Sequence, residues 1–288
     1  MTYRQKYFEL KKENNEYLNN TAIKELLMFD GGFIDFTALI KNFDQELKDE
    51  KTLDEKVERV KSGEPLQYVI GYAFFVNGRY KVNSDVLIPR QETEELAVSA
   101  MTRIVKMYGR DPKITIADIG TGSGILAIYL KEYFPNARVV GIDISPNALE
   151  IARENAAIHH VDVEFIEGNV LDSFKDKIDV IISNPPYIGS KETVSEQTLK
   201  YEPHLALFAS PKTKFYEEIL THIDQMNEEF FIAFEIGEDM QDELSEILES
   251  KYQGLGYIFR EDIYNKTRYL YIMRRKDLEQ YAFEAWWY

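Results

Sequence analysis

The spacing of hydrophobic residues changes near residue 70 of the chain. Before that point apolar residues recur every three or four positions, which is typical of helices that bury one face. We expect helices over residues 2–17 and 43–60, and between them a helix that begins near Thr21 and is broken at Gly31-Gly32. Because each helix has one apolar face, they are expected to pack as a small bundle with a shared core.

A short β-hairpin is predicted after these helices. Residues 74–82 place aromatic side chains on both sides of Asn77-Gly78, the pair preferred in a type I′ turn because both positions need positive φ. We therefore expect a helical domain over residues 1–70, a hairpin linker over residues 71–84, and a larger domain over residues 85–288.

Helices and strands alternate through the larger domain. The expected strands are residues 114–119, 137–142, 163–166, 180–183, 230–236, 257–260 and 268–273, and the expected helices are residues 92–108, 125–133, 147–158 and 240–251. This alternation predicts an α/β fold in which a parallel sheet is covered by helices on both faces. The last two strands follow each other without a helix, so we expect one antiparallel strand at the sheet edge.

Composition narrows the classes of function. The 288 residues are 44% hydrophobic and 29% charged, which is ordinary for a folded globular protein and excludes a disordered chain. The formal net charge of -16 counts against a main partner with a phosphate backbone, because such binders usually carry a basic footprint. The chain has no cysteine, and no pair among its four histidines has the spacing of a helical zinc site, so we expect no metal.

The termini and one acidic segment bear on location and partners. The first residues are charged and lack the apolar region of a signal peptide, and no run of about 18 apolar residues occurs, so we expect a soluble cytoplasmic protein. Residues 221–250 contain ten acids and no Lys or Arg, and they form either a solvated helix face or an acidic surface for a basic partner. The aromatic tail, residues 281–288, either docks on the core or makes a contact surface.

A glycine-rich turn ends the first strand of the larger domain. It consists of Gly120, Thr121, Gly122, Ser123 and Gly124. Glycines allow the backbone to turn sharply into the following helix and to approach a ligand closely. Asp143 ends the next strand about 20 residues later, where an acid is placed to hydrogen-bond ribose hydroxyls. Together these features predict a nucleoside site.

The turn resembles motif I of S-adenosylmethionine-dependent methyltransferases more than the dinucleotide fingerprint, which would need glycine or alanine at position 125. S-adenosylmethionine has no phosphate, and its methionine amino group needs an acid, for which Asp118 is the candidate. Asn169 and Val170, which follow the third strand, are expected beside the adenine. The expected cofactor is therefore S-adenosylmethionine, with S-adenosylhomocysteine as its product.

The strand over residues 180–183 runs into the tetrapeptide Asn184-Pro185-Pro186-Tyr187. Ligands bind at the carboxyl ends of strands in open α/β sheets, so this loop is expected beside the glycine turn. It resembles the signature of methyltransferases that act on planar nitrogens. Because such a nitrogen is a weak nucleophile, we expect Asn184 and the Pro185 carbonyl to accept its N–H groups and to hold it in line, with Tyr187 covering the planar group.

Longer motifs on both sides of this loop resemble one family of such enzymes. They lie at residues 63–71, 86–96, 201–208 and 234–237. These stretches resemble the signatures of the protein-(glutamine-N5) methyltransferases, which modify the glutamine of the Gly-Gly-Gln motif in peptide chain release factors. The resemblance covers about residues 60–275. It implies a class I Rossmann-like methyltransferase sheet with an N-terminal helical domain for substrate recognition.

The resemblance also implies roles for individual residues. The cofactor contacts carry over to Gly120, Gly122, Gly124, Asp143 and Asn184, and the glutamine-binding loop carries over to Asn184, Pro185, Pro186 and Tyr187. Pro89, Arg90, Glu92 and Thr93 are expected to line the neighbouring pocket. The implied partner is a release factor, with no membrane and no direct nucleic-acid partner, and the protein is expected to act as a monomer.

The chain departs from the family pattern at several positions. Gln91 stands where proline is usual, and residues 209–214 replace a glycine-rich run. Asn169 stands where aspartate is common, and Val170 stands where an aromatic residue is frequent, so adenine stacking is expected to be weaker. None of these changes touches residues 184–187, so we expect activity to survive.

Two alternatives remain open on the sequence. The same tetrapeptide serves adenine or cytosine N-methyltransferases of nucleic acids, but the net charge and residues 63–71 count against that function. The altered segment 209–214 also allows a non-catalytic binding protein that keeps the fold. Affinity for S-adenosylmethionine would separate an enzyme from such a protein.

Overall fold

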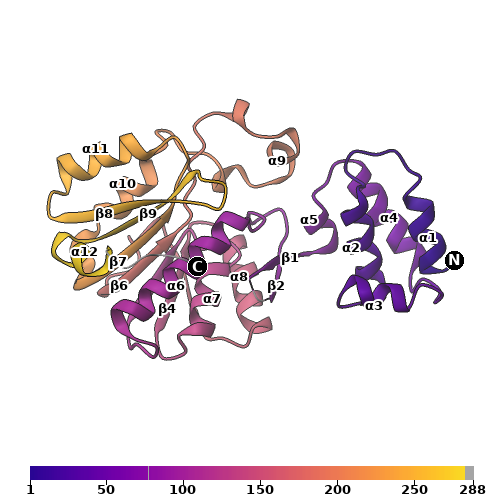
Figure 1. Cartoon of the computed structure of the whole chain (residues 1–288), viewed down its shortest axis with the longest axis horizontal. Coiled ribbons are helices and arrows are strands. Elements are labelled where there is room, and N and C mark those ends of the chain that lie inside the picture. The colour runs from indigo at the N-terminus through magenta and orange to yellow at the C-terminus, as the bar shows by residue number, and fades with distance from the viewer. Residues whose placement is uncertain (77, 283–288) are drawn as a thin grey trace. The chain divides into compact units, whose positions relative to one another are not determined.

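The computed structural model describes residues 1–76 and 78–282 and divides into two compact units (Figure 1). The first unit is Met1–Tyr72 together with Ser195–Tyr201, and the second is Ala73–Val194 together with Glu202–Tyr288. Two predictions lie outside the described residues: the turn position Asn77, and the tail aromatics Phe283, Trp286, Trp287 and Tyr288.

The first unit is helical, as the spacing of its apolar residues predicts. Its helices are α1 Tyr3–Leu10, α2 Asn20–Gly31, α3 Phe36–Lys41, α4 Glu50–Lys61 and α5 Leu66–Ile70, joined by α9 Glu196–Tyr201 from far along the chain. Their apolar faces close around one core, which includes the fully buried Leu26, Leu27 and Leu39. Gln197 of α9 donates to the Gly63 carbonyl at 2.9 Å.

The ends of these helices differ from the predictions because polar side chains cap them. α1 is shorter than predicted and ends at Leu10, and Asn15 accepts the N–H groups of residues 17 and 18 in the turn that follows. α2 is capped by Asn19 rather than by Thr21, which lies inside the helix. Gly32, with φ 65°, ends α2 as predicted. α4 begins only after its cap at Asp49, so the predicted start at residue 43 is wrong.

The second unit contains a seven-stranded sheet and a two-stranded one. β1 Tyr72–Phe75 and β2 Gly78–Lys81 pair with each other, which confirms the predicted hairpin. Its turn comes earlier than predicted, since β1 ends at Phe75, Val76 has a positive φ of 43°, and Gly78 already belongs to β2. The large sheet has the order β5-β4-β3-β6-β7-β9-β8, with strands β3 Thr115–Ile119, β4 Arg138–Asp143, β5 Glu164–Glu167, β6 Ile178–Ser183, β7 Met226–Glu235, β8 Leu255–Glu261 and β9 Thr267–Arg274. β3 to β7 pair in parallel, as predicted for an α/β fold.

The antiparallel strand lies inside the sheet, not at its edge. β9 pairs antiparallel with β7 on one side and with β8 on the other, so the edge strand β8 runs in the direction of the parallel strands. The prediction of an antiparallel edge strand is therefore wrong. The physical reason is burial, since residues 269–273 of β9 are all buried whereas most of β8 is half-exposed.

Helices cover both faces of the large sheet, as predicted. Alternate residues of the central strands, such as Ile116 and Ala117, enter two separate cores. One core is closed by α6 Gln91–Tyr108, α7 Ile125–Tyr133 and α8 Pro146–Ile158, and also receives Leu278 of α12 Arg275–Ala282. The other is closed by α10 Lys214–Leu220 and α11 Gln241–Lys251. The short helices η1 Lys191–Thr193, η2 His204–Ala206 and η3 Ile223–Gln225 complete the described elements.

Two further findings bear on the expected partners and location: the exposure of one acidic segment and the hydrophobicity of the helices. The acids of residues 221–250 are exposed with one exception, Glu235, which is 2% exposed at the end of β7. Within residues 1–76 and 78–282, no helix is both long and apolar enough to cross a membrane.

Candidate active site

The carboxyl ends of β3, β4 and β6 bring the predicted site residues together. Ile119 pairs with Ile142 on one side and with Ser183 on the other. The residues that end or follow these strands, among them Asp143 and Asn184, therefore stand in a row along one edge. The strand order reverses at β3, since β4 and β5 lie to one side of it and β6 and β7 to the other. Such a switch point is where ligands bind in open α/β sheets.

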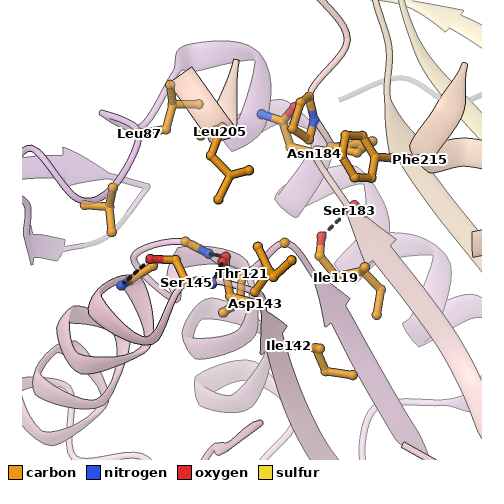
Figure 2. A pocket seen from close by; sticks show the side chains of 18 of the residues that line it. Leu87, Ile119, Thr121, Ile142, Asp143, Ser145, Ser183, Asn184, Leu205 and Phe215 are labelled. Atoms are coloured by element: carbon orange, nitrogen blue, oxygen red, sulfur yellow. Dashed lines mark hydrogen bonds between the residues drawn. The ribbon is translucent and has the colours of Figure 1, made fainter. Parts of the chain in front are cut away.

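A cavity of about 280 Å³ opens at this edge (Figure 2). Its size is near the lower end for small-molecule sites, which is roughly 300 Å³. It is lined by these predicted residues: Pro89, Arg90, Thr93, Gly120, Thr121, Gly122, Ser123, Asp143, Asn169, Val170, Asn184, Pro185 and Pro186. The glycine turn, Asn169, Val170 and most of the tetrapeptide thus border one space.

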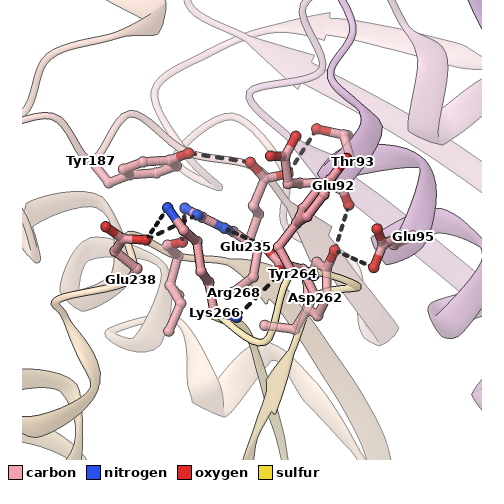
Figure 3. Close-up of polar contacts among 12 residues, drawn as sticks. Glu92, Thr93, Glu95, Tyr187, Glu235, Glu238, Asp262, Tyr264, Lys266 and Arg268 are labelled. Carbon is pink, nitrogen blue, oxygen red and sulfur yellow. Dashed lines mark hydrogen bonds and ion pairs between the residues drawn. The ribbon is translucent and has the colours of Figure 1, made fainter. Parts of the chain in front are cut away.

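Four predicted site residues do not line the cavity: Glu92, Asp118, Gly124 and Tyr187. At Gly124 a β-carbon would stand 3.1 Å from both Ala152 and Ile128, so this glycine allows α7 and α8 to approach each other. Tyr187 extends away from the cavity, and its hydroxyl donates to Glu235 Oε1 at 3.3 Å (Figure 3).

The glycine turn borders open space. Gly120 and Gly122 have φ of 70° and 54°, and a β-carbon on either would meet no atom within 4 Å. The Gly122 N–H donates to Asp143 Oδ2 at 2.8 Å, and the Ser145 N–H donates to Asp143 Oδ1 at 2.9 Å. Burial raises the pKa of the Asp143 carboxyl, and these N–H groups oppose the rise. Asp143 therefore holds the turn while it faces the cavity.

Asp118 supports the same turn from inside the protein. Its Oδ2 accepts from the Thr121 hydroxyl at 2.6 Å and from the Ala127 N–H at 3.2 Å. Its Oδ1 is buried and has no hydrogen-bond partner among the described residues. Burial raises the pKa of this carboxyl to about 7, although the two hydrogen bonds oppose the rise.

Asn184 is held from the side of α6. Its Nδ2 donates to Thr93 Oγ1 at 3.0 Å, and the Thr93 hydroxyl donates to Glu235 Oε2 at 2.7 Å. The preceding residue, Ser183, donates to the Ile119 carbonyl at 2.6 Å and so ties β6 to β3 below the loop. The Asn184 side chain is consequently fixed at the mouth of the cavity.

An ion pair with one buried partner, Glu202, fixes the segment before α6. Arg90 Nη2 donates to Glu202 Oε1, and Glu202 Oε2 accepts from the Ile88 N–H at 3.2 Å. The Glu202 side chain is 3% exposed, so its charge depends on Arg90 for compensation. This pair orders the segment that carries Pro89 beside the cavity.

Several cavity residues are not predicted by sequence reasoning. Leu87, Leu205 and Phe215 give the cavity apolar walls (Figure 2), and Ile144, which follows Asp143, also lines it. Leu205 is 56% exposed although it lines the cavity. These residues come from separate segments without a spacing signal. The sequence hints are that Leu87 and Leu205 lie within the motif stretches 86–96 and 201–208, and that Phe215 directly follows the altered segment 209–214.

Comparison with known proteins gives consistent matches. Residues 100–202 match the family model described as "Methyltransferase small domain". The release factor glutamine methyltransferase of Lactococcus lactis is 38% identical over 229 residues, which cover 78% of this chain and 82% of that protein. The protein of the same name from Bacillus subtilis is 32% identical over 275 residues, which cover 91% and 95%. A solved methyltransferase from Pyrococcus furiosus is similar in fold, with a TM-score of 0.50, 19% identity, and coverage of 68% of this chain and 88% of that one.

Proposed function

Because the chain belongs to the release factor glutamine methyltransferases, we propose that it transfers a methyl group from S-adenosylmethionine to the side-chain amide nitrogen of a release factor glutamine. The glutamine proposed is that of the Gly-Gly-Gln motif. The observation that carries the proposal is the cavity itself, where Asn184, Pro185 and Pro186 border the same space as the glycine turn and Asp143. An acceptor loop and a nucleoside site share one edge of the sheet.

The residues present fit the cofactor. Bound S-adenosylmethionine supplies the methyl group on a sulfonium, an electrophile whose positive charge is lost on transfer. The open space at Gly120 and Gly122 admits a ligand against the backbone, and Asp143 offers carboxylate oxygens to ribose hydroxyls. Asp118 is 1% exposed and does not line the cavity, so its role is to hold the turn through Thr121 rather than to accept from the methionine ammonium group. Asn169 and Val170 are assigned to the adenine side of the cavity.

The tetrapeptide is assigned to the glutamine amide. The Asn184 side-chain oxygen and the Pro185 carbonyl accept the two N–H groups, which fixes the nitrogen and directs its lone pair. Positioning of this kind lowers a barrier by as much as roughly 7–11 kcal/mol. No general base is required, because the proton is lost only after the nitrogen has gained the methyl group. Tyr187 supports the loop through Glu235 rather than lining the cavity.

The helical unit is assigned to recognition of the protein substrate. None of its described residues lines the cavity, so the cavity of the second unit holds the chemistry without it. Release factor residues outside the Gly-Gly-Gln motif are the proposed ligands of the helical unit. We also propose that the protein acts as a cytoplasmic monomer and binds no nucleic acid directly, in keeping with its net charge of -16.

The test is mass spectrometry of an unmethylated release factor after incubation with this protein and S-adenosylmethionine. We expect the peptide that contains Gly-Gly-Gln to gain the mass of one methyl substitution, with fragment ions placing it on the glutamine. A release factor with alanine at that glutamine is the control and should gain nothing. No gain in the unchanged factor, with cofactor binding confirmed by calorimetry, would contradict the proposed substrate.

Affinity for the release factor is expected to fall as salt concentration rises. The enzyme is acidic, with a net charge of -16, and a ribosome-binding partner is expected to present a basic surface. Salt screens exposed charges beyond about 10 Å at 0.1 M ionic strength. KM for the release factor should therefore rise several-fold with added salt, while KM for a short Gly-Gly-Gln peptide changes little. Equal responses of the two substrates would contradict this electrostatic contribution.

A further inference from the structure

A chain of hydrogen bonds leads from Asn184 through Thr93 to Glu235 in the interior of the second unit, and Figure 3 shows its Thr93 and Glu235 end. We propose that Thr93 and Glu235 are positioning residues that determine which end of the Asn184 side-chain amide faces the cavity. The inference rests on the proposed function, because it matters only if Asn184 receives the N–H groups of a substrate amide.

The fold places these three residues together from distant parts of the chain. Ser183 pairs with Phe234 across β6 and β7, so the next residues, Asn184 and Glu235, leave neighbouring strands at the same level. Thr93 comes from the first turn of α6. That turn is tied to β9 by a hydrogen bond of 3.0 Å from the Tyr269 hydroxyl to the Glu92 carbonyl.

When Glu235 is ionised, the hydrogen bonds between Asn184, Thr93 and Glu235 can be arranged in only one way. A carboxylate only accepts hydrogen bonds, so the Thr93 hydroxyl must give its single hydrogen to Glu235 Oε2. Thr93 Oγ1 can then only accept, and the Asn184 group that faces it must be the NH2. The Asn184 oxygen is left for the cavity, which is the orientation that an N–H substrate requires.

Burial protects this arrangement from water. Thr93 is 3% exposed and Glu235 is 2% exposed. The other carboxylate oxygen, Glu235 Oε1, accepts from Tyr187, and the Glu235 backbone carbonyl accepts from the Tyr216 hydroxyl at 2.8 Å. Breaking a hydrogen bond between Thr93 and Glu235 would leave a buried polar group without a partner, so this chain of hydrogen bonds is stable.

When Glu235 is protonated, a second arrangement of these hydrogen bonds becomes possible. A neutral carboxyl can donate to Thr93 Oγ1, which then donates to the Asn184 oxygen and turns the NH2 toward the cavity. Burial raises the pKa of Glu235 to about 7, with Glu92 adding to the rise and the Thr93 and Tyr187 hydrogen bonds and the Arg268 charge opposing it. The polar groups that face Glu235 are Glu92 and Thr93 from α6, Tyr187 from the loop after β6, Tyr216 from α10, and Arg268 and Tyr269 from β9.

Arg268 is itself held beside this site. Its Nε lies 3.4 Å from Asp262, its Nη2 lies 3.7 Å from Glu238, and its Nη1 donates to the Ile236 carbonyl at 3.3 Å (Figure 3). A fixed positive charge favours the ionised carboxylate. As pH falls through about 7, Glu235 gains a proton, and the fraction of enzyme with the Asn184 oxygen toward the cavity decreases.

The test compares Thr93→Val, Thr93→Ser and Glu235→Gln with the wild type in release factor methylation. Wild-type activity is measured first, so failure of the proposed function shows there and not in the variants. We expect Thr93→Val to lower kcat by about 10²-fold with little change in KM for S-adenosylmethionine, and Glu235→Gln, whose amide can turn either an acceptor or a donor to Thr93, to lower kcat by a smaller factor. Thr93→Ser should restore most of the activity, and the fall in kcat below about pH 7 should be absent from Glu235→Gln.

The control is Thr102→Val, which removes a hydroxyl of the same helix that bonds only its own backbone, and its kcat should match the wild type. If Thr93→Val is as active as the wild type, the inference is overturned. It is also overturned if the melting temperature and kcat fall and KM rises together, and Thr93→Ser rescues none of them. That pattern would mean a structural role only.

Discussion

Replacing Asn184 with alanine is expected to lower kcat for release factor methylation by about 10³-fold, while affinity for S-adenosylmethionine falls only several-fold. The substitution removes the side-chain oxygen that we propose receives the substrate N–H, whereas the glycine turn and Asp143 stay in place. The two effects are measured by single-turnover methylation and by calorimetry of cofactor binding.

The matched control is Asn136→Ala. Asn136 is exposed, and its amide donates to Asp111 away from the cavity, so its loss should leave both measurements unchanged. Near-normal kcat in Asn184→Ala would show that the amide oxygen is not the acceptor. Loss of cofactor binding in proportion to kcat would instead assign Asn184 to the cofactor alone.

The elements of the large sheet are predictable because their local signals are strong. β3, β4 and β6 are short apolar runs that end in Asp118-Ile119, Asp143 and Ser183, and observed and predicted ends differ by a few residues at most. The short helices are not predictable in this way. α3 has six residues, and only Leu39 among them is buried, so no apolar period can show.

The order of the last strands depends on packing that no short segment contains. β8 and β9 both look like ordinary strands, and nothing local decides which one pairs with β7. β9 takes that place because Tyr269 and Leu270 enter opposite cores and need cover on both faces. Pairing over such distances follows from burial of the whole sheet.

The residues of the candidate site likewise divide into those that the sequence predicts and those whose role only the fold determines. Asp143 and Asn184 were predictable because motif residues at strand ends gather at one edge of a parallel sheet. The roles of Tyr187 and Glu235 were not, because each depends on the residue opposite it in the fold. For the same reason the motif stretch 201–208 does not predict that Leu205 forms an apolar wall, since its loop reaches the cavity only through tertiary structure.

Replacing either of two glycines in the turn at residues 120–124 with leucine is expected to impair the protein, but through different properties. Gly122→Leu should lower affinity for S-adenosylmethionine by about 10²-fold, because its side chain would enter the open space that the ligand is expected to use. Gly124→Leu should instead lower the melting temperature, because its β-carbon would meet Ala152 and Ile128 at 3.1 Å. Overpacking of that kind costs about 1–3 kcal/mol.

Both glycines have positive φ, 54° and 82°, so Gly122→Leu and Gly124→Leu differ mainly in the atoms that the new side chain would meet. The backbone strain of about 1–2 kcal/mol is therefore shared, and it lowers the melting temperature of both variants alike. The additional loss in Gly124→Leu should come from packing between α7 and α8, and the additional loss in Gly122→Leu should be confined to binding. If Gly122→Leu binds the cofactor like the wild type, the cofactor does not lie against this turn, and the assignment of the cavity is wrong.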